Sequence, residues 1–326
     1  MISSSSSAQS PEGSQGLLSA FEHPAPPFLY PVPESEPRSR SELQEQFRLE
    51  RWLARRLRSA SAEQRRKLYP RVYDELFQNL KTLRQGASAE ESVPQPAPDD
   101  AALGLQEALL EPWLNPSVRF LEVGAGDGAL GRRLAPQVRE AIVLDASIER
   151  LESKDPSSDP PNLRRVVAPA LSGVIPPRSV DLIFSCHFIE HLHPEDAEEH
   201  FREALDTLVP GGRYVIVTPN ALWGPHDISR YFSSEPLGLH LREYTHRALG
   251  GVLRSCGFTD VQPIGVKSSS TLKLHPLPRF LVFPTERVLD RLPLSWRRYA
   301  IQLLANKYRE PLRPLEQVLL VATRPQ

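Results

Sequence analysis

The sequence predicts an α/β fold in which a largely parallel β-sheet has helices on both faces. Five short apolar segments rich in β-branched residues lie between residues 119 and 219, and helix-length stretches separate several of them. Strands that are buried on both faces of a sheet have this near-continuous apolar character. A turn containing three glycines directly follows the first segment, and such turns let the backbone approach a ligand closely.

The bulk composition describes an ordinary globular protein. Its 326 residues suffice for one large domain with extensions, and a hydrophobic content of 40% with a net charge of -1 excludes a uniformly basic nucleic-acid binder. The two cysteines, Cys186 and Cys256, are too few for a disulfide framework and lack the spacing of metal ligands. The chain has neither a secretory signal pattern nor an apolar run of about 18 residues, so we expect a cytoplasmic protein.

The N-terminal part is predicted to contain a tail, a pair of helices and a linker. Residues 1–40 are rich in Ser and Pro and are expected to be disordered, apart from a docking segment at residues 28–30. Apolar side chains recur at helical spacing in residues 41–86. Residues 87–100 have the Pro and Ser content of a linker.

The rest of the chain supplies the sheet. The expected strands are residues 119–123, 141–145, 164–168, 180–186, 213–219, 259–266 and 315–323. A basic insertion, residues 267–313, lies between the last two strands and carries a net charge of +7, against -11 for residues 87–266. Solvated helix faces explain such charge, and the alternatives are an acceptor lid, an oligomer contact or an amphipathic surface at a lipid interface.

The glycine-rich stretch FLEVGAGDGAL, residues 120–130, fits two ligand classes. Its GAGDGA part satisfies the permissive GxGxx(G/A) form of dinucleotide sites. A site for S-adenosylmethionine instead needs an acidic residue two positions before a GxGxG turn. Glu122 precedes the glycines of this turn, Gly124, Gly126 and Gly128, in that way.

Two carboxylates favour the second ligand class. At the end of the first strand, Glu122 would meet the cationic amino group of the methionine part, directly or through water, and would repel the pyrophosphate of a dinucleotide. Asp145 ends the second strand and can accept hydrogen bonds from both ribose hydroxyls, although it could instead cap the following helix. A helix cap accounts for one of these residues, but not for both in register with the turn.

With these motifs the chain resembles the class I, Rossmann-like S-adenosylmethionine-dependent methyltransferases over about residues 101–266 and 315–323. Besides the turn, the segments VDLIFSCHFIEHL, LVPGGRYVIVTPN, HLREYTHRALGGVLRSCGFTDV and LEQVLLVATRP carry the likeness. The resemblance implies a methyltransferase domain over residues 101–326, with a seven-stranded sheet whose antiparallel seventh strand lies between the fifth and sixth. Residues 41–86 would form a helical N-terminal cap, and residues 267–313 a helical insertion before the last strand.

The resemblance also implies contacts with the cofactor S-adenosyl-L-methionine. Gly124, Ala125 and Gly126 would pass under its methionine and ribose parts. Asp145 would hold the ribose diol, and Ala146 would pack beside adenine.

The resemblance also indicates which residues would lie near the methyl group and near the adenine of the cofactor. Ser185, which ends the fourth strand, would border the sulfonium and the entry for the acceptor. The family often has an acidic residue after the third strand that binds the adenine amino group, but this chain has Ala168-Pro169-Ala170. Adenine recognition would therefore fall to backbone groups.

Methyl transfer is an in-line displacement that depends mainly on alignment, and a base is needed only for a weakly acidic hydroxyl or a protonated amine. His187 after the fourth strand and His226 after the fifth are the candidate bases, because histidine ionises near neutrality. His200, on an acidic helix, is expected to be solvated. His191 and His193 also follow the fourth strand, but no metal site is predicted, since three convergent ligands with supporting groups are required.

These observations predict O-methylation of a small-molecule acceptor, which the basic insertion suggests is anionic or lipid-linked. Residues 267–313 would make any peripheral membrane contact. No nucleic-acid partner is expected, because the basic helices of residues 41–86 lack interleaved stacking aromatics. The alternatives are an NAD(P)-dependent oxidoreductase and a cofactor-binding scaffold without turnover, and the sequence does not determine the oligomeric state.

Overall fold

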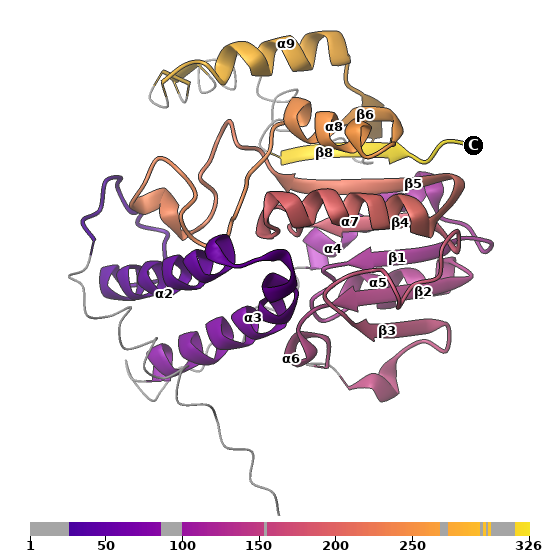
Figure 1. Cartoon of the computed structure of the whole chain (residues 1–326), viewed down its shortest axis with the longest axis horizontal. Helices are drawn as coiled ribbons and strands as arrows, with labels where there is room; N and C mark the ends of the chain where they lie inside the picture. The colour runs from indigo at the N-terminus through magenta and orange to yellow at the C-terminus, as the bar shows by residue number, and fades with distance from the viewer. Residues whose placement is uncertain are drawn as a thin grey trace, which may run out of the picture.

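The centre of the molecule is one eight-stranded sheet with the strand order β3-β2-β1-β4-β5-β8-β6-β7 (Figure 1). The computed structural model describes residues 26–85, 100–152, 155–267, 273–293, 296–297, 299–300 and 317–326. The strands are β1 Arg119–Val123, β2 Glu140–Asp145, β3 Leu163–Val167, β4 Val180–Cys186, β5 Leu208–Pro219, β6 Thr259–Lys267, β7 Lys273–Pro276 and β8 Gln317–Thr323. Strands β1 to β5 pair in parallel, whereas β8 lies antiparallel between β5 and β6.

This topology confirms the predicted Rossmann-like sheet and the antiparallel strand near its end. The predicted count of seven strands is wrong by one. Residues 273–276 form β7, which pairs antiparallel with β6 at the edge of the sheet. A sheet edge offers unpaired backbone groups to any chain that folds back on it, and β7 takes that place. The insertion, residues 267–313, is therefore not wholly helical.

Helices cover both faces of the sheet. They are α2 Arg40–Ser59, α3 Ala62–Gln85, α4 Asp100–Leu110, α5 Ala129–Leu134, α6 Ile148–Leu151, α7 Pro194–Thr207, α8 His246–Ser255 and α9 Arg279–Leu289. Successive side chains of β1 and β4 pack into different cores on the two faces of the sheet. Leu121 and Ile183 pack with residues of α2, α7 and α8, whereas Phe120 and Leu182 pack with residues of α4 and α5. Burial on both faces explains why these strands are almost continuously apolar in sequence.

The N-terminal helices α2 and α3 lie side by side next to the sheet edge where the parallel strands end (Figure 1). Ser39 and Glu42 form a capping box that starts α2. In α3, the buried Arg65 guanidinium donates to Asp196 of α7 at 2.6 Å, and Tyr69 donates to the same carboxylate at 2.6 Å. Because this ion pair and hydrogen bond join α3 to α7, the two N-terminal helices are fixed over the strand ends.

The segment before α2 is ordered over more residues than the predicted docking segment at residues 28–30. Phe28 packs against Phe232 with 4.7 Å between the ring centroids, and the Leu29 amide donates to the Tyr231 carbonyl at 2.9 Å. Buried aromatic contacts offset the entropy lost on ordering the backbone, so residues 26–39 follow the surface of the fold. The predicted docking segment lies within this stretch.

Two other predicted regions fall largely outside the described residues. They are residues 1–25 of the tail and residues 86–99, which include all of the predicted linker except Asp100, the first residue of α4.

The insertion is attached to the domain through α9. The carboxylate of Glu286 accepts hydrogen bonds from the amides of His246 and Arg247 and so caps the N-terminus of α8. Its Oε1 also lies 2.8 Å from Nδ1 of His246, and both side chains are buried. None of the helices that the structure describes is long and apolar enough to cross a membrane.

Candidate functional site

The turn between β1 and α5 has the conformation that its glycines predict. Gly124, Gly126 and Gly128 have φ values of 69°, 58° and 71°, a region that favours glycine over residues with a side chain. The amides of Gly124 and Ala125 donate to the Leu144 carbonyl at 2.9 and 3.0 Å. The turn is thereby held against the end of β2.

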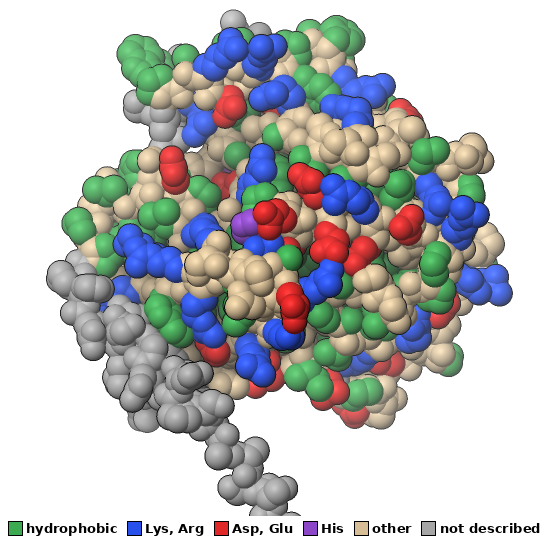
Figure 2. Space-filling model, in the orientation of Figure 1, with side chains coloured by type: hydrophobic (Ala, Val, Ile, Leu, Met, Phe, Trp, Pro, Cys, Tyr) green, Lys and Arg blue, Asp and Glu red, His purple; other side chains and the backbone are tan. Residues whose placement is uncertain are grey.

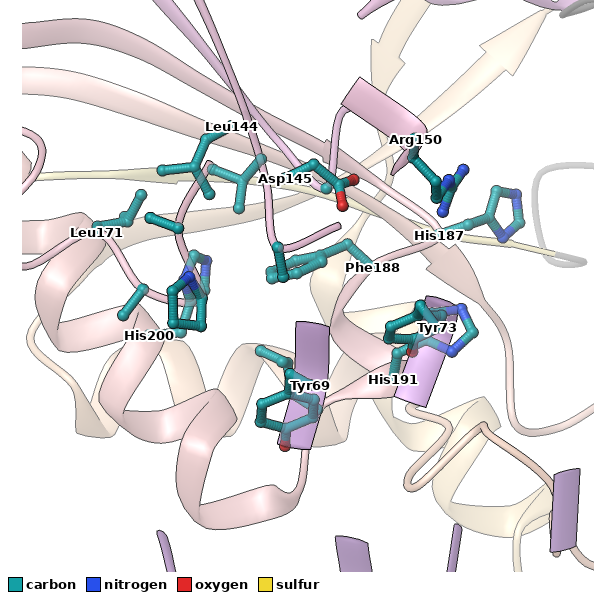
Figure 3. Close-up of a pocket in the computed structure, with 17 residues that line it drawn as sticks. Tyr69, Tyr73, Leu144, Asp145, Arg150, Leu171, His187, Phe188, His191 and His200 are labelled. Atoms are coloured by element: carbon teal, nitrogen blue, oxygen red, sulfur yellow. The ribbon is translucent and has the colours of Figure 1, made fainter. Parts of the chain in front are cut away.

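Asp145 joins the glycine turn to the turn that follows β2. Its Oδ2 accepts from the Gly126 amide at 2.8 Å, and its Oδ1 accepts from the Ser147 amide at 2.9 Å. The side chain is 7% exposed and its carboxylate faces the pocket shown in Figure 3. Each carboxylate oxygen has a second lone pair, so Asp145 can still accept hydrogen bonds from a ligand.

Glu122 lies beneath α5, outside the lining of the pocket that contains Asp145. Its Oε2 accepts from the Gly131 amide of α5 at 3.1 Å. Burial, with a smaller contribution from Asp127 and Asp145, raises the pKa of Glu122 to about 8. The group is therefore uncharged at neutral pH in this structure, and its contact with the methionine amino group stays a prediction.

A pocket that is partly open to solvent lies where β1, β2 and β4 end, and we call it the sheet-edge pocket (Figure 3). Its lining residues are Tyr69, Tyr73, Val123, Gly124, Leu144, Asp145, Ala146, Arg150, Ala168, Pro169, Ala170, Leu171, His187, Phe188, His191, Leu192 and His200. Of the predicted site residues, Gly124, Asp145, Ala146 and His187 line it. Ala125, Gly126, Gly128 and Ser185 do not.

Phe188 explains why the first glycine of the turn has no side chain. A Cβ atom placed on Gly124 would lie 2.7 Å from the Phe188 ring. The Phe188 ring packs edge-on against His200 with 5.2 Å between centroids, and both residues line the sheet-edge pocket. Glycine therefore lets an aromatic side chain lie directly against the turn.

His200 corrects the expectation of a solvated side chain. It is 7% exposed, and burial lowers its pKa to about 3, so it is neutral. Its Nε2 lies 2.8 Å from the hydroxyl of Tyr214, which donates to Ser185 Oγ at 3.0 Å. Although α7 is acidic overall, position 200 lies on its inner face beside the buried Phe201. The predicted sulfonium contact of Ser185 is untested, and its hydroxyl is fully buried beneath this chain of hydrogen bonds.

A second pocket of about 790 Å³ adjoins the first, and we call it the histidine pocket. Its lining residues are Arg38, Gln46, Glu50, Tyr73, Leu76, Arg150, His191, His226, Asp227, Ile228, Arg230, Leu239 and His240. Tyr73, Arg150 and His191 line both pockets. The candidate bases thus lie in different pockets, with His187 in the sheet-edge pocket and His226 in the histidine pocket.

The shared wall contains two residues that the sequence analysis did not assign. Tyr73 is one helical turn after Tyr69 on α3, and its buried hydroxyl has no hydrogen-bond partner among the described residues. Its ring meets the His191 ring edge-on, with 5.9 Å between centroids. Burial lowers the pKa of His191 to about 4, and its Nδ1 lies 3.1 Å from the Leu239 carbonyl. The spacing of Tyr69 and Tyr73 was the available signal, because it places both on one helix face.

A buried carboxylate, that of Glu190, lies close to His191 and His240, which line the histidine pocket. Glu190 is fully buried and its Oε2 accepts from Thr218 Oγ1 at 2.8 Å. Burial opposes its ionisation, but His187, His191 and His240 outweigh burial and lower the pKa of Glu190 to about 2. The Glu190 carboxylate is therefore ionised at neutral pH.

The methyltransferase-domain family matches residues 120–212 of this chain. This segment contains the glycine turn, Asp145 and the strand end that carries His187 and Glu190. The chain contains a methyltransferase domain. The predicted class I, Rossmann-like methyltransferase and its cofactor, S-adenosyl-L-methionine, are confirmed for this domain.

Comparison with solved structures finds matches at low sequence identity. A chain of the Haloferax volcanii complex between the Trm112 methyltransferase activator and a methyltransferase is 18% identical, with a TM-score of 0.48 over 70% of this chain and 92% of that one. YcgJ from Bacillus subtilis is 18% identical to this chain, with a TM-score of 0.44 over 70% of this chain and 100% of that one. An S-adenosylmethionine-dependent methyltransferase from Mesorhizobium loti is also 18% identical, with a TM-score of 0.44 over 69% of this chain and 99% of that one. No curated protein matches the sequence.

Proposed function

We propose that the protein transfers a methyl group from S-adenosylmethionine to an oxygen atom of a small anionic acceptor. The cofactor would occupy the sheet-edge pocket and the acceptor the histidine pocket. The observation that carries this proposal is the shared wall of Tyr73, Arg150 and His191, because it brings the two pockets together at one place. Methyl transfer requires such adjacency, since the acceptor atom must lie in line with the methyl group.

Residues of the sheet-edge pocket suit the parts of the cofactor. The ribose would lie at Asp145, and the methionine part would pass over Gly124. Adenine would lie near Ala146 and the apolar stretch 168–171, where backbone groups would have to recognise its amino group. Glu122 would support the turn from beneath α5, because its carboxyl group bonds the Gly131 amide.

Basic side chains in the histidine pocket support an anionic acceptor. Arg38, Arg150 and Arg230 line this pocket, and a guanidinium group binds carboxylate or phosphate oxygens well. Glu50 and Asp227 also line it and would limit the negative charge that it accepts. We therefore expect a small acceptor with a single negative charge, because three arginines and two carboxylates line the pocket.

His226 is the better candidate base for an acceptor hydroxyl. Its Nε2 lies 2.9 Å from the Asn220 carbonyl, so the proton belongs on Nε2 and Nδ1 is the nitrogen left to accept another. The Nδ1 of His187 lies 3.3 Å from Glu190, and its Nε2 lies 3.4 Å from the Gln317 amide nitrogen. Both ring nitrogens of His187 thus already have polar neighbours.

Calorimetry with the full chain tests the proposed cofactor. We expect S-adenosylmethionine and S-adenosylhomocysteine to bind at one site per chain, and NAD to give no heat. Binding of NAD in their place would contradict the proposal and support the oxidoreductase alternative. Cofactor binding without turnover, over a panel of phenols, sugars and lipid intermediates that includes anionic members, would support the alternative of a scaffold without activity.

The insertion supports a separate proposal, that the protein touches an anionic membrane surface. Helix α9 exposes apolar side chains, with Phe280 at 76% and Val288 at 61%, and Trp296 beyond it is 66% exposed. Figure 2 shows Lys and Arg side chains beside hydrophobic ones over α9. Amphipathic basic helices of this kind bind anionic lipid surfaces.

The enzyme would act in the cytoplasm, where the thiols of Cys186 and Cys256 stay reduced.

Vesicle sedimentation tests this membrane contact. Vesicles with anionic lipid should sediment the protein, neutral vesicles should sediment less of it, and Phe280→Ser should weaken the effect. Leu105→Ser is the matched control, since Leu105 is 53% exposed on α4. Equal absence of binding to both kinds of vesicle would contradict the contact.

A further inference from the structure

One carboxylate and two imidazoles converge beside the histidine pocket. The ligand atoms of Glu190, His191 and His240 lie within 4.8 Å of one another. Glu190 and His191 follow β4, whereas His240 comes from the loop that precedes α8. We infer that these three side chains bind one divalent transition-metal ion.

An unpaired oxygen points to a missing partner in this cluster. Among the residues that the structure describes, none makes a well-aligned hydrogen bond to the buried Oε1 of Glu190, while Oε2 is already bonded to Thr218. His187 Nδ1 lies 3.3 Å from Oε1, but not in hydrogen-bonding geometry. An unsatisfied buried carboxylate oxygen is costly, and a bound cation would remove that cost.

The two imidazoles are held as metal-binding histidines usually are. Nδ1 of His191 lies 3.1 Å from the Leu239 carbonyl, and Nδ1 of His240 lies 2.7 Å from Oε1 of Glu243. Each oxygen accepts a hydrogen bond from Nδ1–H, so Nε2 of each ring is the nitrogen left to bind a metal. A carbonyl or carboxylate behind each ligating ring is the usual support of such sites.

Further acidic groups surround the cluster and favour a cation. Asp227 and Glu243 are negative neighbours of His240, in addition to Glu190. Glu50 lines the same pocket and lies near Asp227 and His240. The guanidinium of the nearby Arg58 donates to backbone carbonyls, including that of His240.

The ligand set indicates which ions fit. Two nitrogens and one carboxylate suit Zn²⁺, Fe²⁺ or Mn²⁺, whereas Ca²⁺ and Mg²⁺ prefer oxygen ligands throughout. Three protein ligands leave coordination positions open, and His191 and His240 both line the histidine pocket. A metal there would face an acceptor oxygen and lower the pKa of its hydroxyl, a consequence that rests on the proposed function.

Metal titration of the untagged full chain tests the site. After treatment with EDTA and dialysis, we expect Zn²⁺ and Mn²⁺ to bind at one ion per chain by calorimetry and elemental analysis, and Mg²⁺ to bind far more weakly. Zn²⁺ should also raise the melting temperature, because it binds the folded state. Glu190→Gln and His240→Asn should each lower Zn²⁺ affinity by at least ~100-fold, and Glu243→Gln by about 10–100-fold.

His275→Gln is the matched control, because His275 is exposed on β7 and outside the cluster. It should bind Zn²⁺ as the unaltered chain does. Failure of the unaltered chain to bind Zn²⁺ or Mn²⁺ stoichiometrically would overturn the inference, as would unchanged affinity in Glu190→Gln and His240→Asn. These measurements use neither cofactor nor acceptor, so their failure leaves the proposed methyl transfer standing, and failed methyl transfer would leave the metal site standing.

Discussion

The two pockets share a wall, yet they are built in different ways. The sheet-edge pocket is formed mainly by turns that directly follow β1, β2 and β4, so neighbouring strands of one sheet fix its shape. The histidine pocket combines residues of α2 and α3 with the loop after β5, segments far apart in the sequence. Parallel strand ends thus provide a fixed site for a cofactor, whereas the added helices and loops can shape a site for a particular acceptor.

Replacing His226 should have the largest effect and would separate the roles of the two pockets. We expect His226→Gln to lower the turnover number by about 10²–10⁴-fold, the usual contribution of a general base. The dissociation constant of S-adenosylmethionine, measured by calorimetry, should not change. His275→Gln serves as the control. If cofactor affinity fell as much as turnover, the assignment of the histidine pocket to the acceptor would be wrong.

Changing pH should reveal the protonation of the buried Glu122 carboxyl group beneath the glycine turn. The pKa of Glu122 is raised to about 8 in the folded protein, from an ordinary value of 4.5. The folded state therefore holds the proton more tightly, and stability should fall as pH rises from 4.5 to about 8, by ~5 kcal/mol at most. Glu122→Gln cannot ionise, so this part of the pH dependence should disappear from its denaturant unfolding curves. An unchanged pH profile in the variant would count against the buried neutral carboxyl group.

Asp145→Asn should have a smaller effect and sharpens the assignment of the sheet-edge pocket. The amide keeps one acceptor oxygen but loses the charge and one acceptor, so the affinity for S-adenosylmethionine should fall about 10–100-fold, the cost of a hydrogen bond to a charged group. Asp155→Asn, on an exposed turn, is the matched control. Equal affinities for both variants would place the ribose away from Asp145.

The same difference in construction explains what could be predicted from the sequence. The predicted strands 119–123 and 180–186 coincide with β1 and β4, because strands buried on both faces carry a local, nearly continuous apolar signal. The glycine turn and Asp145 were likewise visible as a motif of adjacent residues. Both signals belong to the sheet and its edge.

The histidine pocket has no comparable local signal. The approach of His240 to Glu190 depends on how the loop before α8 folds over the sheet edge, which helical or strand periodicity does not encode. The orientation of α7 likewise decided that His200 is buried. Apart from the docking segment predicted at residues 28–30, residues 26–39 carry few apolar residues, so their order could not be predicted from the sequence.

The most direct test of the account is a crystal structure of the protein with S-adenosylhomocysteine. The account predicts the ribose at Asp145, adenine beside residues 168–171 and the sulfur atom facing Tyr73 and His191 at the wall between the pockets. An adenosyl group bound in the histidine pocket, or a sulfur atom directed away from that wall, would contradict it.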